Sequence, residues 1–285
     1  MVKNNKVALV GMILVLFVIS TAVFTIVDKY MLNNKIISYF LYSPNKLDIM
    51  AQLEPPSLKH PLGTDQLGRD LLSRVIYGSR ISIQVGFFAV GVSGIIGTII
   101  GLIAGYYGGM VDDIIMRIVD ILLAFPGLIL AIAVAGFLGP SLMNVVFALS
   151  IRAWVNYARL IRGNVLSVKE TDYISAAKVT GMGPLRLLSR HVLPNSVAPI
   201  IVQATMGLGS MIIAEAALSF LGLGPQPPTP SWGNLLSTGR SYVSTAWWLS
   251  IFPGIAIFIT VMGFNLIGDA VRDFLDPKIS GGLRQ

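Results

Sequence analysis

The sequence contains no cysteine and only two histidines, His60 and His191, among its 285 residues. Without cysteine, the chain forms neither a disulfide nor a thiolate metal site, and two histidines so far apart do not predict a metal site either. It also lacks a G-x-x-x-x-G-K-[ST] phosphate loop and an H-E-x-x-H zinc motif. We therefore expect no cofactor or metal bound by this chain and no enzymatic activity of its own.

Charged side chains are also scarce. They make up 12% of the chain, whereas 54% of the residues are hydrophobic and the mean hydropathy is +0.74. A soluble domain carries about 25% charged residues. The composition therefore predicts an all-α integral membrane protein, and the net charge of +7 is to be interpreted through membrane topology rather than as a nucleic-acid signal.

Six apolar segments are candidates for membrane-spanning helices, each of which needs roughly 20 residues. They cover residues 7–27, 81–107, 118–138, 142–160, 197–221 and 249–271. The first exceeds the apolar core of about 7–15 residues that is typical of a cleaved signal peptide, so we interpret it as a retained anchor helix. Lysine and arginine concentrate in the loops expected to lie inside, which predicts that both termini are cytoplasmic.

These segments divide the chain into an N-terminal part, residues 1–80, a transmembrane core, residues 81–277, and a short cytoplasmic tail, residues 278–285. Within the N-terminal part, apolar residues recur at helical spacing in residues 60–80, among them Leu67 and Leu71. This pattern favours an amphipathic helix lying on the membrane surface. Pro126 is expected to kink the third span.

Two features inside the predicted spans bear on packing and transport. Gly97, Gly101 and Gly105 recur every four residues, which predicts a helix-packing seam, within this chain or against a partner. Arg152 lies within the fourth span, where an arginine costs about 2.5–3.5 kcal/mol on insertion scales. Arg152 either pairs with an acid or with helix carbonyls at a subunit interface, or faces the substrate path and attracts a carboxylate.

Residues 171–194 are the longest basic, hydrogen-bonding stretch between two apolar runs. Thr171 or Asp172 can cap a short helix, and Gly181 can end it in the left-handed conformation. A second helix, residues 184–192, starts with a proline at its first turn, and Pro194 is expected to stop it before the next span. The stretch therefore predicts a helix–turn–helix elbow that projects from the membrane.

This elbow resembles the EAA loop of ABC-importer permeases. The matching positions are Ser175, Ala176, Ala177, Gly181, Leu193 and Pro194. Ser175 stands where the motif has an acidic residue, and His191 stands where an aliphatic residue is usual. From about residue 60 to residue 277, the chain also resembles the C-type permease subunit of dipeptide, oligopeptide and nickel importers, for example in residues 116–131, 157–167, 219–233 and 264–277.

The resemblance implies a type I importer permease fold with a coupling helix, in a bacterial or archaeal inner or plasma membrane. It implies a homologous B-type permease, two ATPase subunits that bind ATP and Mg²⁺, and an extracytoplasmic substrate-binding protein as partners. Di- or oligopeptides are the expected substrates, with nickel, metal chelates or oligosaccharides as alternatives. Three functions of a different class also fit the composition: an ion-coupled carrier, a channel and a membrane scaffold.

Overall fold

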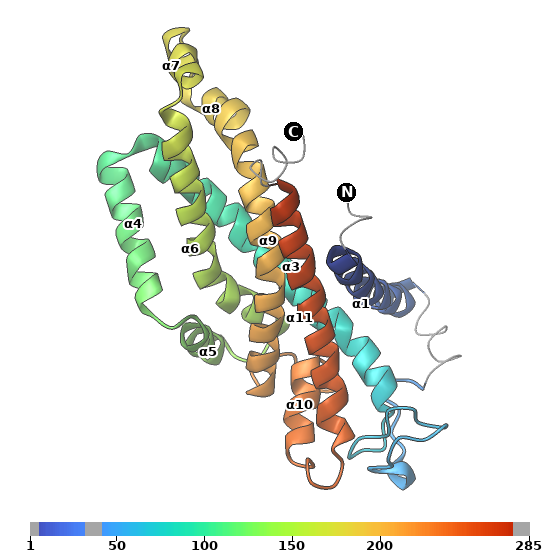
Figure 1. Ribbon diagram of the computed structural model, residues 1–285. Coiled ribbons are helices and arrows are strands. Elements are labelled where there is room, and N and C mark those ends of the chain that lie inside the picture. The colour runs from blue at the N-terminus through green and yellow to red at the C-terminus, as the bar shows by residue number, and fades with distance from the viewer. Residues whose placement is uncertain (1–5, 32–41, 276–285) are drawn as a thin grey trace.

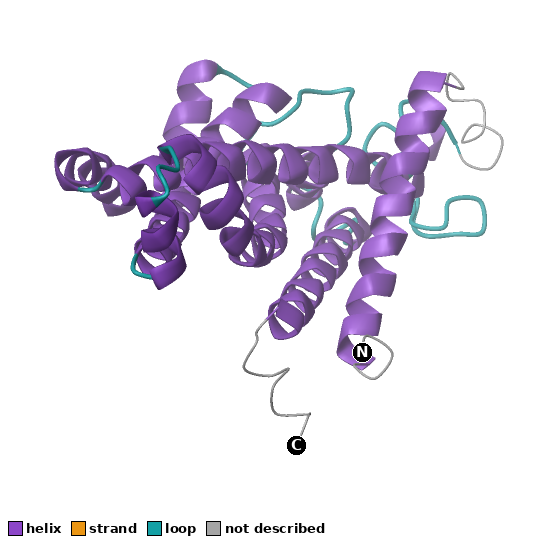
Figure 2. Ribbon diagram, turned by 90° about the horizontal axis from the view of Figure 1, so that it is seen from above, coloured by secondary structure: helices purple, strands orange, loops and turns teal. Residues whose placement is uncertain are grey.

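The structure is a computed structural model that describes residues 6–31 and 42–275, so the predicted tail lies outside the described residues. The helices are α1 (Lys6–Met31), η2 (Ile49–Ala51), α3 (Leu71–Tyr107), α4 (Gly109–Ala124), α5 (Gly127–Leu138), α6 (Leu142–Lys169), α7 (Asp172–Val179), α8 (Pro184–Leu187), η3 (Leu188–Val192), α9 (Leu193–Phe220), α10 (Trp232–Arg240) and α11 (Trp248–Leu275). Figure 2 shows helices joined by loops and no strand in this described part, which confirms the predicted all-α class.

Four helical stretches in the described ranges are long and apolar enough to cross a membrane, and α4 with α5 makes a fifth if this bent pair is counted as one span. The remaining predicted span corresponds to α6, which is 28 residues long. This helix is less apolar because it carries Arg152, Arg159 and Arg162. It nevertheless packs extensively along α3, with which it forms the largest helix–helix contact.

The third predicted span is sharply broken at Pro126. Phe125 and Pro126 both have extended backbone angles, and the axes of α4 and α5 differ by 90°. A proline disfavours the helical conformation of the residue before it and removes one backbone donor. The predicted kink is therefore confirmed, and it is sharp enough to set the first turn of α5 against other helices.

The segment before α3 differs from the prediction. Asp65 accepts hydrogen bonds from the backbone N–H groups of Leu67 and Arg69, and Asp70 caps α3 by accepting from the N–H of Ser73. Aspartate side chains that bond to nearby backbone groups favour turns over helix. The predicted surface helix over residues 60–80 is therefore wrong: a tight turn ends at Asp70, and the remainder is the start of α3.

The two ends of the bundle have different characters. α7 and α8 project at one end, towards which α11 also ends, whereas α10 and residues 42–70 lie at the other end (Figure 1). At that second end, the indole N–H of Trp232 donates to the carbonyl of Val75, and that of Trp248 donates to Thr64. These two buried tryptophans fix the loop segment and α10 onto α3 and α11.

Candidate functional site: the elbow and the α6–α9 seam

The elbow consists of α7, a turn through Gly181, α8 and the π-helical segment η3. Gly181 has a φ of +78°, in the left-handed region that favours glycine, and a Cβ added there would meet no atom within 4 Å. Ser175 and Ala176 are exposed on α7, and Ala177 is half-buried. Four of the six positions that match the EAA motif, Ser175, Ala176, Ala177 and Gly181, therefore lie together on α7 and its turn.

One face of the elbow is anchored in the bundle. Ile174, Leu187 and Val192 are fully buried and belong to one apolar cluster with Ile161 and Val165 of α6. Burying a branched apolar side chain stabilises a fold by about 1.5–3 kcal/mol relative to leaving it exposed in water. A displacement of the elbow therefore disturbs its contacts with α6.

A second link connects the elbow to α3. The Nζ atom of Lys169, just before α7, donates to the carbonyls of Gly105 and Tyr106 at 3.2 and 2.8 Å. A lysine is favourable there because the carbonyls at the C-terminus of a helix carry partial negative charge. The elbow is thus tied to the ends of α3 and α6.

The opposite face of the elbow is unburied. Val179 and Leu185 are 89% and 82% exposed, and Arg186 and Arg190 line an open groove of about 540 Å³ beside Leu185. We call this face, formed by α7, the Gly181 turn and α8 with η3, the elbow face. It combines exposed apolar side chains, small residues and positive charge.

Pro194 does not stop the second elbow helix, so this prediction is wrong. η3 runs directly into α9, and Pro194 lies in the first turn of α9, where a helix needs no backbone donor. The side-chain amide of Asn195 donates to the carbonyl of His191 at 2.6 Å, which satisfies an acceptor in the widened turn. The second elbow helix, α8 with η3, and the fifth predicted span are therefore one continuous helical stretch, Pro184–Phe220.

The three glycines of α3 lie against α6 of the same chain. A Cβ added at Gly101 would be 2.5 Å from the carbonyl oxygen of Ala158, and one at Gly105 would be 2.6 Å from the Cβ of Val165. At Gly97, an added Cβ would collide with the carbonyl oxygen of Trp154. The two backbones approach so closely that there is no space for any side chain at these positions.

Arg152 lines a cavity of about 260 Å³ between α5, α6 and α9. Its side chain lies against Gly127, the first residue of α5, where an added Cβ would be 2.8 Å from the Cδ of the arginine. The cavity also contacts Asn156, four residues further along α6, and Ser210 of α9. The polar side chains of the cavity therefore come from two helices, α6 and α9.

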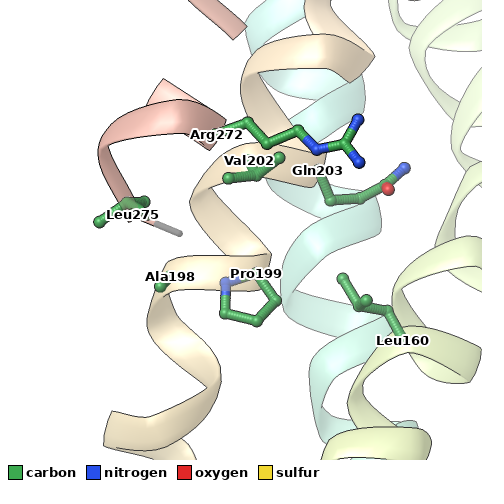
Figure 3. Close-up of a pocket in the computed structure, with 7 residues that line it drawn as sticks. All are labelled: Leu160, Ala198, Pro199, Val202, Gln203, Arg272 and Leu275. Carbon is green, nitrogen blue, oxygen red and sulfur yellow. The ribbon is translucent and has the colours of Figure 1, made fainter. Parts of the chain in front are cut away.

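A second cavity of about 260 Å³ lies between α6, α9 and α11, and Figure 3 shows the residues that line it. Its polar side chains are those of Gln203 and Arg272, which extend towards the same side. Leu160 lies eight residues after Arg152 on α6, so helical periodicity puts both on one face. We call the parts of α6 and α9 that line the two cavities the α6–α9 seam.

Among the polar residues that line the two cavities, only Arg152 was predicted from the sequence. The others are Asn156, Gln203, Ser210 and Arg272. The i, i+4 spacing from Arg152 was a usable signal for Asn156. Gln203 and Ser210 are single uncharged polar residues within an apolar run and give no such signal, because helices of membrane proteins contain many of them.

The fold resembles that of chains in solved ABC importers. A chain of the MetNI methionine ABC transporter in its inward-facing conformations superposes with a TM-score of 0.58 at 18% identity, covering 72% of this chain and 98% of that one. A chain of an amino acid ABC transporter with histidines superposes with a TM-score of 0.56 at 16% identity. The fold is therefore that of an ABC-importer permease.

The sequence comparisons narrow this class to a family. Residues 97–281 match the family described as binding-protein-dependent transport system inner membrane component. The dipeptide transport system permease protein of Alkalihalophilus pseudofirmus is 48% identical over 277 residues, covering 97% of this chain and 88% of the relative. The glutathione transport system permease protein of Pectobacterium atrosepticum is 50% identical over 235 residues, covering 82% and 78%. The chain belongs to this family of inner-membrane transport permeases.

Proposed function

We propose that this chain forms one half of the translocation path of an ATP-driven importer of di- and oligopeptides. A homologous B-type permease supplies the other half, two ATPase subunits bind ATP and Mg²⁺, and an extracytoplasmic binding protein delivers the substrate. Family membership supports the transport role of the chain. The chain itself has no catalytic residue in this account and contributes the path and the coupling surface.

The observation that carries the proposal is the two-sided elbow. Its buried face, centred on Leu187, packs with α6, and its exposed face presents Leu185 and Arg186. An exposed apolar patch next to charged residues on a projecting element is typical of a protein-binding surface. We infer that the elbow face docks on an ATPase subunit, whose movement then reaches α6 and α3 through the buried cluster and Lys169. Ser175 makes this contact without the acidic residue of the motif.

Peptide is the substrate class that the relatives favour. The relatives from A. pseudofirmus and P. atrosepticum are named for dipeptide and glutathione transport, and a 48% identical Escherichia coli relative is named for D,D-dipeptide transport. These are all short peptides, although each name applies to its own protein.

The orientation follows from the same account. If the elbow face binds ATPase subunits, the end of the bundle that carries α7 and α8 is cytoplasmic. α11 ends towards this end of the molecule (Figure 1), which supports a cytoplasmic C-terminus. The opposite end, with α10 and residues 42–70, then faces the binding protein.

The test is uptake of a labelled dipeptide into proteoliposomes that contain the complete complex with its binding protein. We expect uptake only when ATP is supplied on the ATPase side and none when the ATPase subunits are omitted. Uptake by this chain without ATPase subunits, driven by a proton or sodium gradient, would identify an ion-coupled carrier instead. ATP-driven uptake of nickel, a metal chelate or an oligosaccharide, but of no peptide, would contradict the proposed peptide substrate and leave the importer role unchanged.

A further inference from the structure

The cavity around Arg152 has a charge without a counter-charge. The Nε atom of Arg152 is buried and has no hydrogen-bond partner among the described residues. No described carboxylate forms an ion pair with this arginine, whereas Arg69, Arg74, Arg159 and Arg162 each pair with an aspartate. Arg152 as a whole is half-buried, and a guanidinium whose buried nitrogen has no partner is costly in an apolar environment. The cavity is therefore electrostatically complementary to an anion.

The neighbouring groups reinforce this complementarity. Gly127 and Leu128 form the first turn of α5, and no side chain caps this turn. The first N–H groups of a helix have no partner within the helix and carry partial positive charge, so a helix N-terminus favours an anion. Asn156 adds an amide and Ser210 adds a hydroxyl to the same cavity. None of the residues that line the cavity is acidic.

The rest of the cavity wall is apolar. The lining side chains on that part are Leu128, Ala131, Leu149, Ala153, Met211 and Ala214. The cavity, about 260 Å³, is slightly smaller than the lower limit of small-ligand sites, which is about 300 Å³. It therefore suits a terminal part of a peptide, with its carboxylate at the arginine and a small apolar side chain against the wall.

We propose that Arg152, with Asn156 and the first turn of α5, forms a subsite in this permease that receives the C-terminal carboxylate of the passing peptide. The inference rests on the proposed function, because it places the substrate on a path along the α6–α9 seam. The guanidinium donates hydrogen bonds to the carboxylate, and the charge pair offsets the cost of carrying a charged terminus through the membrane. Because the contact is made during passage, the subsite selects between substrates that the binding protein has already delivered.

The experiment compares uptake of Ala-Ala with uptake of its C-terminal amide by the complete complex in proteoliposomes. For each substrate, the rate of a variant is divided by the rate of the parent complex with the same binding protein, so that the binding protein's own preference cancels. Arg152→Gln is expected to lower the Ala-Ala ratio about tenfold, the loss of one charged hydrogen bond, and to leave the amide ratio near one or raise it. Arg117→Gln, at an exposed position of α4, is the matched control and should change neither ratio.

Two outcomes with the Arg152→Gln complex overturn the inference. If an assembled Arg152→Gln complex loses uptake of both substrates equally, the arginine does not bind the peptide's carboxylate. Failure of that complex to assemble would show that the arginine has a structural role, through an acid or helix carbonyls at a subunit interface. Gly127→Ala provides an independent variant, because the new Cβ displaces the Arg152 side chain without removing its charge. It should lower the Ala-Ala ratio selectively, and an equal change for both substrates contradicts the inference. A parent complex that takes up neither substrate refutes the proposed function instead.

Discussion

The guanidinium of Arg162 on α6 holds the carboxylate of Asp112 on α4 through two hydrogen bonds, from Nε and from a terminal nitrogen, each 2.5 Å long. The Asp112 side chain is 12% exposed and that of Arg162 is 32% exposed. A second pair, Asp120 with Arg159, joins the same two helices but is 56% and 55% exposed. Both are Asp–Arg pairs between α4 and α6, and they differ mainly in hydrogen-bond geometry and solvent exposure. Each pair can therefore serve as the control for the other.

We expect the inner pair to stabilise the chain and the outer pair to contribute little. A double-mutant cycle with Asp112→Asn and Arg162→Gln should give a coupling energy of about 1–3 kcal/mol, because two-point charged hydrogen bonds are strong. The same cycle with Asp120→Asn and Arg159→Gln should give about 0–1 kcal/mol, as for exposed ion pairs. Unfolding titrations of the purified chain in detergent measure both. Equal coupling energies for the two pairs would contradict the account.

The glycine seam between α3 and α6 gives a second prediction. Gly101→Leu should sharply reduce the yield of folded complex, because the new side chain overlaps the backbone at Ala158 and the Cβ of Ile161. Gly91→Leu is the control on the same helix, since a Cβ at Gly91 meets no atom within 4 Å. Size-exclusion chromatography of the complex gives the readout. Normal assembly of Gly101→Leu with altered substrate preference would indicate that this face lines the path instead.

A third prediction concerns Gly181 in the elbow turn. Gly181→Val should reduce dipeptide uptake while the complex still assembles, because a β-branched residue is strained at a φ of +78° and adds bulk at the elbow face. Gly181→Asn should retain more uptake, because asparagine tolerates the left-handed conformation. ATP hydrolysis and uptake are measured together in proteoliposomes. Full dipeptide uptake with Gly181→Val would show that the conformation of the elbow turn is not needed for coupling to the ATPase.

Much of this architecture could be predicted from the sequence because long apolar runs and glycine or proline positions act locally. The break at Pro126, the turn at Gly181 and the all-α class follow from such local rules. Local rules also explain two errors. Residues 60–80 have helical periodicity, yet Asp65 and Asp70 bind backbone groups and delay the helix until Leu71. Pro194 can stop a helix, but after a π-helical segment it lies in a first turn.

Contacts between distant segments could not be predicted in the same way. The carboxylate of Glu215 on α9 is fully buried and accepts hydrogen bonds from the hydroxyls of Ser82 and Ser219, each at 2.7 Å. Ser82 is 133 positions away in the sequence, and nothing in either local pattern relates the two. The cavity around Arg152 is similar, since it depends on how α5, α6 and α9 meet.

The most direct test of the account is a single-cysteine cross-linking measurement in the complete complex, which is straightforward because the chain has no cysteine of its own. A cysteine at Ser175 should cross-link to an ATPase subunit and should be protected from a water-soluble maleimide when the ATPase subunits are bound. A cysteine at Ser241, exposed just after α10, should label freely and form no such cross-link. Free labelling at residue 175 together with ATPase cross-links at residue 241 would contradict both the coupling role of the elbow and the proposed orientation of the chain.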